Sequence, residues 1–383
     1  MELYVHLPFC ARKCRYCDFA SYAGCLSQIP AYIDAVLTEA AWEADTLAHP
    51  VMDTIFLGGG TPSLVPPEEL TRLLRGLAAL FPFANNVEFT TEANPGTVTQ
   101  PWLSAAIACG INRLSLGMQA LQPHLLQTLG RIHDFRQVEQ SVHLAQAAGL
   151  RNLNLDLMFG LPGQTMEDWL ATLDAACSLS PTHLSCYGLI PEDGTPLKND
   201  LDMGILTLPD VDKERAMYDA AITCLAKLGF EQYEISNFAL PGHACRHNLG
   251  YWRQTPYLGL GASASSMLCT DDARYSYIRR TNPASLANYF RMVKERHYAL
   301  REEAPVSPAD AQFETLMLGL RTTRGVQETA YRQMHGAPLS ARYGRTLERL
   351  AAQGLLMHEN GWWRLTRRGM DVQNAVLVEL MED

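Results

Sequence analysis

The stretch HLPFCARKCRYCDF, residues 6–19, places Cys10, Cys14 and Cys17 on one short segment. Soft thiolates at such close and unequal spacing can hold one corner of an iron–sulfur cluster. Three ligands leave one iron of a [4Fe–4S] cube open to an exogenous ligand. A zinc site and three unrelated thiols are the alternatives, but a closed zinc site needs four ligands, and neither His6 nor Cys25 stands at a usual ligand spacing. The spacing therefore favours a [4Fe–4S] cluster.

Length and composition indicate a folded chain with a sizeable core. The 383 residues suffice for two or three domains, or for one large barrel with an appendage, and 47% of them are apolar. The balance of 31 Lys and Arg against 41 Asp and Glu gives a net charge of −10, which argues against general nucleic-acid binding. The other seven cysteines are scattered, as expected for reduced thiols. Apolar runs are too short for a bilayer and the chain starts with the strand-like LYVHL, so we expect a cytoplasmic protein without a leader.

Apolar runs alternate with helical periodicity along the first half of the chain. Strands are predicted at Glu2–Leu7, Thr54–Leu57, Val87–Thr91, Arg113–Leu116, Asn152–Leu157 and His183–Tyr187. Helices are predicted at Ala31–Leu47, Pro67–Phe81, Pro101–Ala108, Phe135–Ala148, Thr165–Leu179 and Val211–Leu228. This alternation predicts right-handed βαβ units and an α/β fold with a parallel sheet. Periodicity by itself does not separate an open doubly wound sheet from a partial barrel.

A polar motif follows every predicted strand. In chain order these are the cysteine loop, Gly58-Gly59-Gly60-Thr61-Pro62, Glu92-Ala93-Asn94-Pro95, Gly117-Met118-Gln119, Asp156 with Phe159-Gly160-Leu161-Pro162-Gly163, and Tyr187. In β/α barrels the active site is built at the carboxyl ends of the strands. We therefore expect these motifs to converge on one rim.

Each of these residues also has a plain structural explanation. GGGTP is either a tight turn or a run of glycines that lets a ligand approach the backbone. Glu92 is either a solvated charge at a strand end or a ligand contact. Gln119, Arg131 and Asp156 would fit the surface or a satisfied core equally well. Their shared position at strand ends beside the cysteine loop favours ligand contact.

Longer motifs resemble a known family over most of the first 240 residues. YVHLPFC, CRYCDF, LGGGTPS, EANPG, NRLSLGMQ, LGRIH and DLMFGLPGQT resemble the oxygen-independent coproporphyrinogen oxidase family of the radical SAM superfamily. The resemblance implies a partial (β/α)6 barrel whose cluster has an open iron for S-adenosylmethionine (SAM). It implies SAM contacts from Tyr4, Gly59 and Glu92. In the true oxidase a second SAM is bound at the positions of Tyr16, Gly60, Thr61, Gln119, Arg131 and Asp156.

Two departures separate this chain from the true oxidase. That enzyme has a fourth cysteine two residues after the third, where this chain has Phe19. It also has a substantial extension ahead of the first strand, where this chain has only a few residues. Both features resemble the haem chaperone HemW family instead. The second SAM site is therefore in doubt even though its residues are present.

A third feature, HNxxYW within Cys245-Arg246-His247-Asn248-Leu249-Gly250-Tyr251-Trp252, resembles the hallmark of the HemW family. It offers the imidazole of His247 for haem iron and the rings of Tyr251 and Trp252 for a porphyrin face. The alternative is a packed Tyr–Trp pair with a hydrogen-bonded histidine. Cys245 is a second candidate soft ligand, and we expect Asn248 to orient the loop or the imidazole.

The predicted organisation has three parts. Residues 1–240 form the radical SAM partial barrel, residues 241–303 a connecting segment with the HNxxYW motif, and residues 304–383 a C-terminal domain of the HemW and oxidase type. Helices at Asp310–Leu320 and Leu339–Gln353 and a hairpin around Trp362–Leu365 resemble a small winged-helix-like α+β domain. A winged helix raises DNA binding as an alternative. From Leu300 to Asp383, however, ten Lys and Arg against eleven Asp and Glu give 10 − 11 = −1, without the basic excess of a DNA reader.

Two classes of function follow. The first is a haem chaperone that holds a [4Fe–4S] cluster and SAM and delivers haem to respiratory haem proteins. The second is a radical SAM enzyme that decarboxylates coproporphyrinogen III or opens a porphyrin ring. Phe19 and the short N-terminus both favour the chaperone. The negative net charge and the short apolar runs predict no nucleic-acid partner and no transmembrane segment, and peripheral membrane association and a monomer or a cluster-dependent homodimer stay open.

Overall fold

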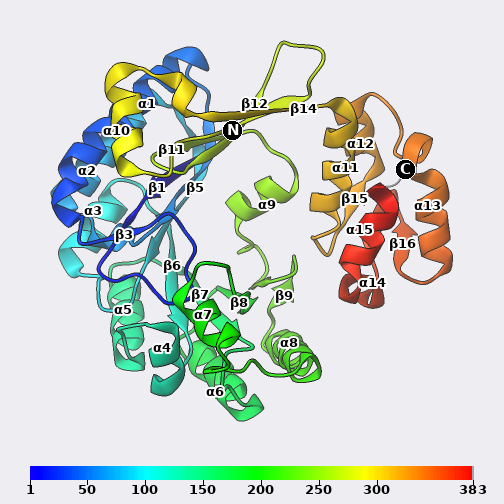
Figure 1. The fold of residues 1–383 in the computed structure, drawn as a ribbon, viewed down its shortest axis with the longest axis horizontal. Coiled ribbons are helices and arrows are strands. Elements are labelled where there is room, and N and C mark those ends of the chain that lie inside the picture. Colours follow the sequence, from blue (N-terminus) through cyan, green and yellow to red (C-terminus); the bar gives the residue numbers. More distant parts are fainter. Residues whose placement is uncertain (382–383) are drawn as a thin grey trace.

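Six parallel strands form the centre of a 12-stranded sheet, in a computed structural model that describes residues 1–381 (Figure 1). In spatial order they are β1 (Glu2–Leu7), β4 (Met52–Gly59), β5 (Phe83–Ala93), β6 (Arg113–Gln119), β7 (Asn152–Phe159) and β8 (His183–Gly188). All six contain the predicted strands, five of them extending beyond the predicted bounds, and the α/β class with a partial barrel is confirmed. The sheet stays open, because hydrogen bonds do not join its first and last strands. Residues 382 and 383, at the end of the predicted C-terminal domain, lie outside the described residues.

Helices fill the connections between these strands. They are α1 (Ile29–Thr46), α2 (Pro67–Leu80), α3 (Gln100–Ala108), α4 (Pro123–Leu129), α5 (Phe135–Ala147) and α6 (Met166–Ser178). Two more helices, α7 (Pro196–Asp202) and α8 (Val211–Lys227), follow β8. Local sequence sets several starts: the side chains of Asp134 and Thr165 make capping boxes at α5 and α6. The short helices α4 and α7 were not predicted. No helix among the described residues has both the length and the apolarity needed to cross a membrane.

The central strands alternate apolar and polar side chains, and this alternation gives the partial barrel a polar interior. Leu3, Val5 and Leu7 of β1, like the matching leucines of β7, belong to the core that packs with the helices. The intervening side chains, such as Tyr4 of β1 and Asp156 of β7, line an internal cavity instead. Because neighbouring side chains on a strand point to opposite faces, one register fixes both the core and the site.

The sheet extends beyond the six predicted strands on both sides. β11 (Tyr257–Leu260) pairs in parallel with β1, followed by the antiparallel strands β12 (Ser265–Cys269), β13 (Tyr277–Thr281) and β14 (Glu302–Val306). On the other edge lie β10 (Asn237–Ala239) and β9 (Glu231–Gln232). The remaining elements of this part are β2 (Phe9–Cys10), β3 (Tyr22–Ala23), η1 (Leu26–Gln28), η2 (Pro62–Leu64), α9 (Arg246–Trp252), α10 (Leu286–Glu295) and η3 (Tyr298–Leu300). The segment expected to connect the domains therefore supplies β11–β13, which our sequence analysis missed.

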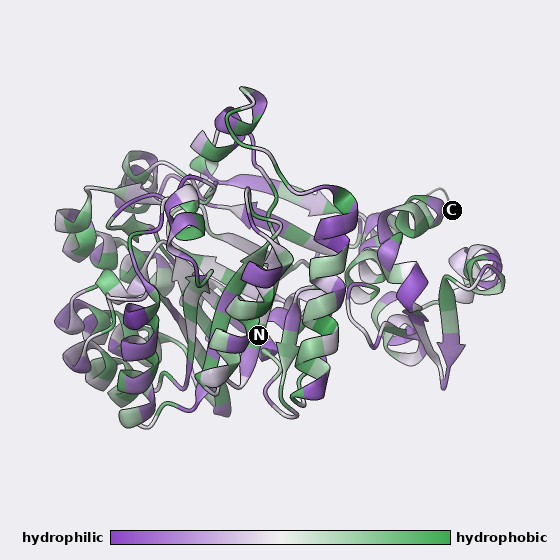
Figure 2. Ribbon diagram, turned by 90° about the horizontal axis from the view of Figure 1, so that it is seen from below, coloured by the Kyte–Doolittle hydropathy of each residue, from purple (hydrophilic) through white to green (hydrophobic). Residues whose placement is uncertain are grey.

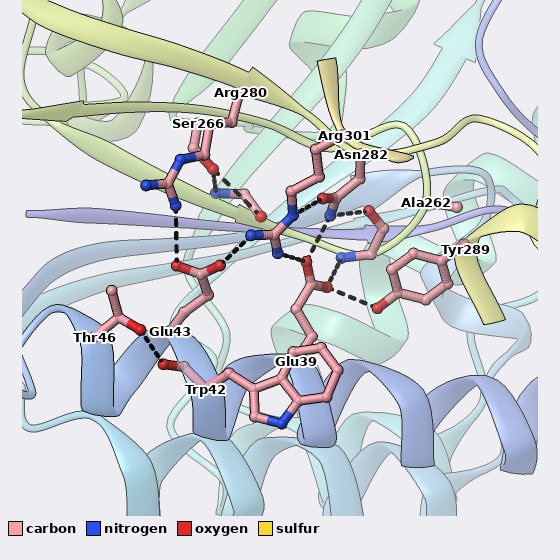
Figure 3. A network of polar contacts seen from close by, with 12 residues as sticks. Glu39, Trp42, Glu43, Thr46, Ala262, Ser266, Arg280, Asn282, Tyr289 and Arg301 are labelled. Atoms are coloured by element: carbon pink, nitrogen blue, oxygen red, sulfur yellow. Dashed lines mark hydrogen bonds and ion pairs between the residues drawn. The ribbon is translucent and has the colours of Figure 1, made fainter. Parts of the chain in front are cut away.

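A buried ionic network fastens this extension to α1 (Figure 3). The carboxylate of Glu39, which has no exposed surface, accepts hydrogen bonds from Arg301 (2.8 Å) and Tyr289 (2.7 Å). Arg301 also pairs with Glu43 at 2.6 Å, so one guanidinium joins two carboxylates of the helix. Glu39 in addition accepts the backbone N–H of Gly261 at 2.9 Å. Because β11 is parallel to β1, the network fixes a loop at the same end of the sheet as the cysteine loop.

The C-terminal residues form a separate domain beside the sheet (Figure 1). Its elements are α11 (Pro308–Gly319), β15 (Val326–Gln327), α12 (Glu328–His335), α13 (Ser340–Ala352), β16 (Leu356–Glu359), β17 (Trp362–Leu365), α14 (Arg367–Asp371) and α15 (Gln373–Met381). A core of its own, built around Leu316, Tyr343 and Leu347, holds it together. Figure 2 shows hydrophobic and hydrophilic residues alternating along its helices, as expected for helices with one buried face. Arg279 of β13 binds Glu314 of α11 through two hydrogen bonds of 2.8 and 2.6 Å and ties the domain to the sheet.

Candidate functional site

The cysteine loop leaves the end of β1 and is held in place by two short helices. The backbone N–H of Arg15 donates to the carbonyl of Leu129 at the end of α4 (2.9 Å). The carbonyl of Arg15 accepts from Leu197 of α7 (2.9 Å), and its guanidinium pairs with Asp200. This clamp places Cys10, Cys14 and Cys17 along one cavity of about 410 Å³. Cys25 does not line that cavity.

The three thiols line one cavity but do not meet at one point. Among residues 1–381, no three His, Cys, Asp or Glu side chains converge closely enough to hold one metal ion. A cluster instead takes thiolates spread around a cube, one on each iron. Thr61 and Arg131 direct donors at Cys10 Sγ (3.7 Å) and Cys14 Sγ (3.5 Å), which would stabilise thiolates. Burial raises the pKa of the Cys10 and Cys17 thiols, so the charge of the irons would have to favour their deprotonation.

The glycine triplet after β4 packs against the start of the cysteine loop. Gly59 has φ of +107°, and a Cβ there would lie 2.4 Å from the ring of His6. A Cβ on Gly60 would lie 2.7 Å from the backbone of Phe9. The N–H of Gly60 donates to Leu7, and that of Thr61 to Phe9, at 2.9 and 2.7 Å. The triplet is thus needed for close packing of the protein itself, while Gly59 and Gly60 also line the cavity.

Two acidic side chains face the same cavity, Glu92 from β5 and Asp156 from β7, with β6 between the two strands. Glu92 accepts the N–H of Gly59 at 3.1 Å, and burial with the nearby charge of Asp156 raises the pKa of Glu92 to about 7. Asp156 accepts hydrogen bonds from Ser115 (3.0 Å) and Asn154 (2.8 Å), although burial raises its pKa. A cationic ligand would favour the ionised form of both carboxyl groups.

The remaining predicted side chains complete the rim. Arg131 donates to Asn94 Oδ1 at 2.7 Å and to the carbonyl of Gly117 at 2.8 Å. Asn94 in turn donates to Thr61 at 2.8 Å. Gln119 ends β6 with φ of +65°, a conformation that is uncommon outside glycine and that occurs at ligand sites. Tyr16 lines the cavity together with these residues. Sequence reasoning did not single out Asn94, although it stands two residues after Glu92 in the EANP motif.

The HNxxYW motif forms α9, and its start is anchored by a buried carboxylate on β5. Glu88 accepts the backbone N–H groups of Arg246 (2.9 Å) and His247 (3.0 Å), and the thiol of the buried Cys245 approaches it at 3.4 Å. The first N–H groups of a helix have no acceptor within the helix, and here the Glu88 carboxylate is their acceptor. The placement of α9 therefore depends on β5, far away in the sequence.

His247 is held on all sides in this structure. It is 1% exposed, its Nδ1 lies 2.7 Å from Thr54 Oγ1, and its Nε2 lies 2.9 Å from the Tyr251 hydroxyl. Its ring stacks on Phe56 with centroids 5.2 Å apart. Burial, together with the charge of Arg113, lowers the pKa of His247 to about 3, so the ring is neutral near pH 7. Neither ring nitrogen is free to bind iron unless one of these contacts breaks.

Two further cavities adjoin the cavity that the three cysteines line, which we call the cluster cavity. The larger, about 630 Å³, lies between the barrel rim and the sheet extension and is lined by aromatic and apolar side chains that include Phe19, Tyr251, Tyr257, Met267 and Leu318. The smaller, about 220 Å³, lies inside the partial barrel. Tyr4, Glu92 and Tyr251 line both, so they form the wall between the two spaces. Trp252 does not line either cavity; the guanidinium of Arg321 lies 4.9 Å from its ring centroid.

Comparisons with known proteins agree with this arrangement. Residues 4–176 match the Radical SAM superfamily and residues 306–372 match the HemN C-terminal domain. The Heme chaperone HemW of Bacillus subtilis is 34% identical over 377 residues, which cover 97% of this chain and 97% of that protein. The Heme chaperone HemW of Escherichia coli is 34% identical over 379 residues, which cover 98% of this chain and 97% of that protein. Among solved structures, the coproporphyrinogen III oxidase HemN of Escherichia coli superposes with a TM-score of 0.83 at 22% identity, over 99% of this chain and 89% of that one.

Proposed function

This chain belongs to the heme chaperone HemW family within the radical SAM superfamily, and we propose that it is itself a haem chaperone that delivers haem to respiratory haem proteins in the cytoplasm. The observation that carries the proposal is the adjacency of two cavities. One is lined by the three cysteines, and the other is large, aromatic and bordered by Tyr251 of the HNxxYW motif. Phe19, Gly59 and Glu92 line both, so a cluster with SAM and a porphyrin would be neighbours.

In this proposal Cys10, Cys14 and Cys17 hold the [4Fe–4S] cluster. The cluster, when bound, would supply an open iron for the amino and carboxylate groups of SAM. Gly59 and Glu92 line the same cavity as the cysteines, where Glu92 offers a carboxylate to the cationic ligand, and Tyr4 lines the larger cavity next to it. Phe19 is 61% exposed at the rim of both cavities, in the place where the oxidase carries a fourth cysteine.

Haem is proposed to lie in the larger cavity, since the affinity for a porphyrin comes largely from burial of its apolar faces. Tyr251, Tyr257 and Met267 offer such a surface. We propose His247 as the axial ligand. It borders the smaller cavity and not the larger one, so ligation requires both its release from Thr54 or from Tyr251, whose contacts engage its ring nitrogens, and a shift toward the larger cavity. A movement of α9 would then break one of these hydrogen bonds and free the imidazole as haem enters.

A second candidate function is radical SAM catalysis, and one observation favours it. Tyr16, Gln119, Arg131 and Asp156, which correspond to second-SAM positions of the oxidase, all line the cluster cavity. We rank this candidate second because of Phe19, the departure that separates this chain from the oxidase. Peripheral membrane association and a cluster-dependent homodimer stay predictions.

Transfer of haem tests the chaperone proposal. Anaerobically reconstituted, haem-loaded protein would be mixed with a respiratory haem protein freed of its haem, and the Soret bands of donor and acceptor would be followed. We expect the acceptor to gain haem faster than it does from free haem in the same buffer. The variant without the three cluster cysteines serves as the control for a role of the cluster. Haem that stays on the chain, or reaches the acceptor no faster than free haem does, would count against a chaperone.

A further inference from the structure

The small cavity of about 220 Å³ inside the partial barrel has no ligand of its own in the function described so far, although Glu92 and His247 border it. It is lined by side chains of β1, β4, β5, β6, β7, β8 and α9. His247, Asn248 and Tyr251 of the HNxxYW motif all face it, whereas Trp252 does not. Three of the four named residues of the motif therefore border one internal space, opposite the side chains of β6 and β7.

Arg113 of β6 brings a positive charge into this cavity without a partner. It is 2% exposed and lines the cavity; its backbone is paired in the sheet, but its guanidinium makes no hydrogen bond or ion pair among residues 1–381, and its Nε is a buried donor without an acceptor. Glu88 and Asp156 act on it only through space, because Glu88 holds the start of α9 and Asp156 is bound by Ser115 and Asn154. An unpaired buried charge is costly, so a guanidinium in this position calls for an anion.

A second donor stands next to the same space. The side-chain amide of Asn248 lines the cavity and likewise makes no hydrogen bond within the described part of the chain. The role expected for it, orienting the loop, is carried by Glu88 instead. A guanidinium and an amide that converge on one small cavity match the two oxygens of a carboxylate. Glu92 and Asp156 also border the space, so a singly charged anion fits it better than a phosphate dianion would.

We propose that Arg113 and Asn248 form a carboxylate-binding pocket that receives a propionate side chain of the bound haem. This inference rests on the proposed haem-carrying function and specifies how that same site holds its cargo. The macrocycle would occupy the larger cavity, and the propionate would pass beside Tyr4, Glu92 and Tyr251, which line both spaces. The HNxxYW motif would then supply an imidazole, an acid-binding amide and an aromatic wall from a single turn of helix.

The test compares haem with haem dimethyl ester, in which both propionates are neutral. We expect the wild-type protein to bind haem about tenfold or more tightly than the ester, since a charged hydrogen bond is lost with the ester. Arg113→Met and Asn248→Leu should each bring the two affinities to within about twofold of each other. Arg279→Gln is the matched control, because Arg279 lines the larger cavity but is engaged by Glu314, and it should keep the wild-type preference.

Every outcome decides between explanations. Equal binding of haem and ester by the wild type, or a preference that survives both cavity variants, would overturn the carboxylate pocket and leave Arg113 a structural counter-charge. Failure of the wild type to bind either compound would instead refute the haem-carrying function. In that case sodium propionate still tests the pocket: it should raise the melting temperature of the wild type over sodium chloride at equal ionic strength. No rise would overturn the pocket as well. If Arg113→Met does not fold, Arg113→Lys and Asn248→Leu carry the comparison.

Discussion

Removal of the Glu88 carboxylate should detach α9 and disturb the HNxxYW motif while leaving the side chains of the motif unchanged. Glu88 accepts the N–H groups of Arg246 and His247 at 2.9 and 3.0 Å, in a site that is almost closed to water. In Glu88→Ala both N–H groups lose their acceptor, at about 1–3 kcal/mol each, so the variant should lose about 2–6 kcal/mol. Glu88→Gln keeps one carbonyl oxygen and should lose roughly half of that. A helix of only seven residues has little stability of its own to offset the loss.

Hydrogen exchange is the appropriate assay, because the core of the central sheet is separate from that of the C-terminal domain and a global unfolding curve would mix them. We expect the amides of residues 246–252 to lose protection by about tenfold or more in Glu88→Ala, which corresponds to ~1.4 kcal/mol. The amides of α13, in the C-terminal domain, should keep theirs. Glu348→Gln, an exposed acid on α13, is the matched control. Unchanged protection of α9 in Glu88→Ala would refute the anchoring role of the carboxylate.

Three other predictions address the ligands themselves. Replacement of Cys10, Cys14 or Cys17 by Ala should remove the brown chromophore and the bound iron, whereas Cys25→Ala should keep both, since Cys25 lies outside the cavity. An unchanged iron content in the variant that lacks all three cysteines would contradict the assignment. Glu92→Gln should weaken SAM binding about tenfold in a titration. Wild-type affinity for SAM should fall as the pH drops below about 7, because burial raises the pKa of Glu92 to about 7 and the protonated form carries no charge for the cation. The same pH profile in Glu92→Gln would assign the effect elsewhere. His247→Ala should shift or abolish the Soret band of the haem complex, and Tyr251→Phe, which releases one ring nitrogen, should speed haem binding; an unaltered Soret band in the first variant would leave His247 a packing residue.

The central fold could be predicted because its strands carry a regular pattern. The six parallel strands were predicted from alternating or continuous apolar runs, and β1 has the predicted bounds Glu2–Leu7. The sheet extension could not be predicted in this way. Strands such as YIRRT at Tyr277–Thr281 and EEAPV at Glu302–Val306 contain too few apolar residues for a pattern. Their stability comes from pairing with one another and from the Glu39–Arg301 network, which joins residues 262 positions apart.

Part of the candidate site could also be predicted from the regular strand pattern. The rule that strand ends converge brings Cys14, Glu92, Arg131 and Asp156 to one cavity. Arg113 and Glu88 were missed because their importance depends on strand register. Each lies within its strand rather than at the carboxyl end, and only the pairing of the strands shows that its side chain points into the partial barrel. The helix α9 is too short to show helical periodicity, so the sequence revealed the residues of the motif but could not predict the contacts that hold His247.

One measurement separates the chaperone from the oxidase most directly. The anaerobically reconstituted protein, with its cluster and SAM, would be offered haem and coproporphyrinogen III together, and retained haem and decarboxylated product would be measured in the same sample. Our account predicts stoichiometric haem on the protein and coproporphyrinogen III recovered unchanged. Conversion of coproporphyrinogen III to protoporphyrinogen IX, with no haem retained, would contradict it.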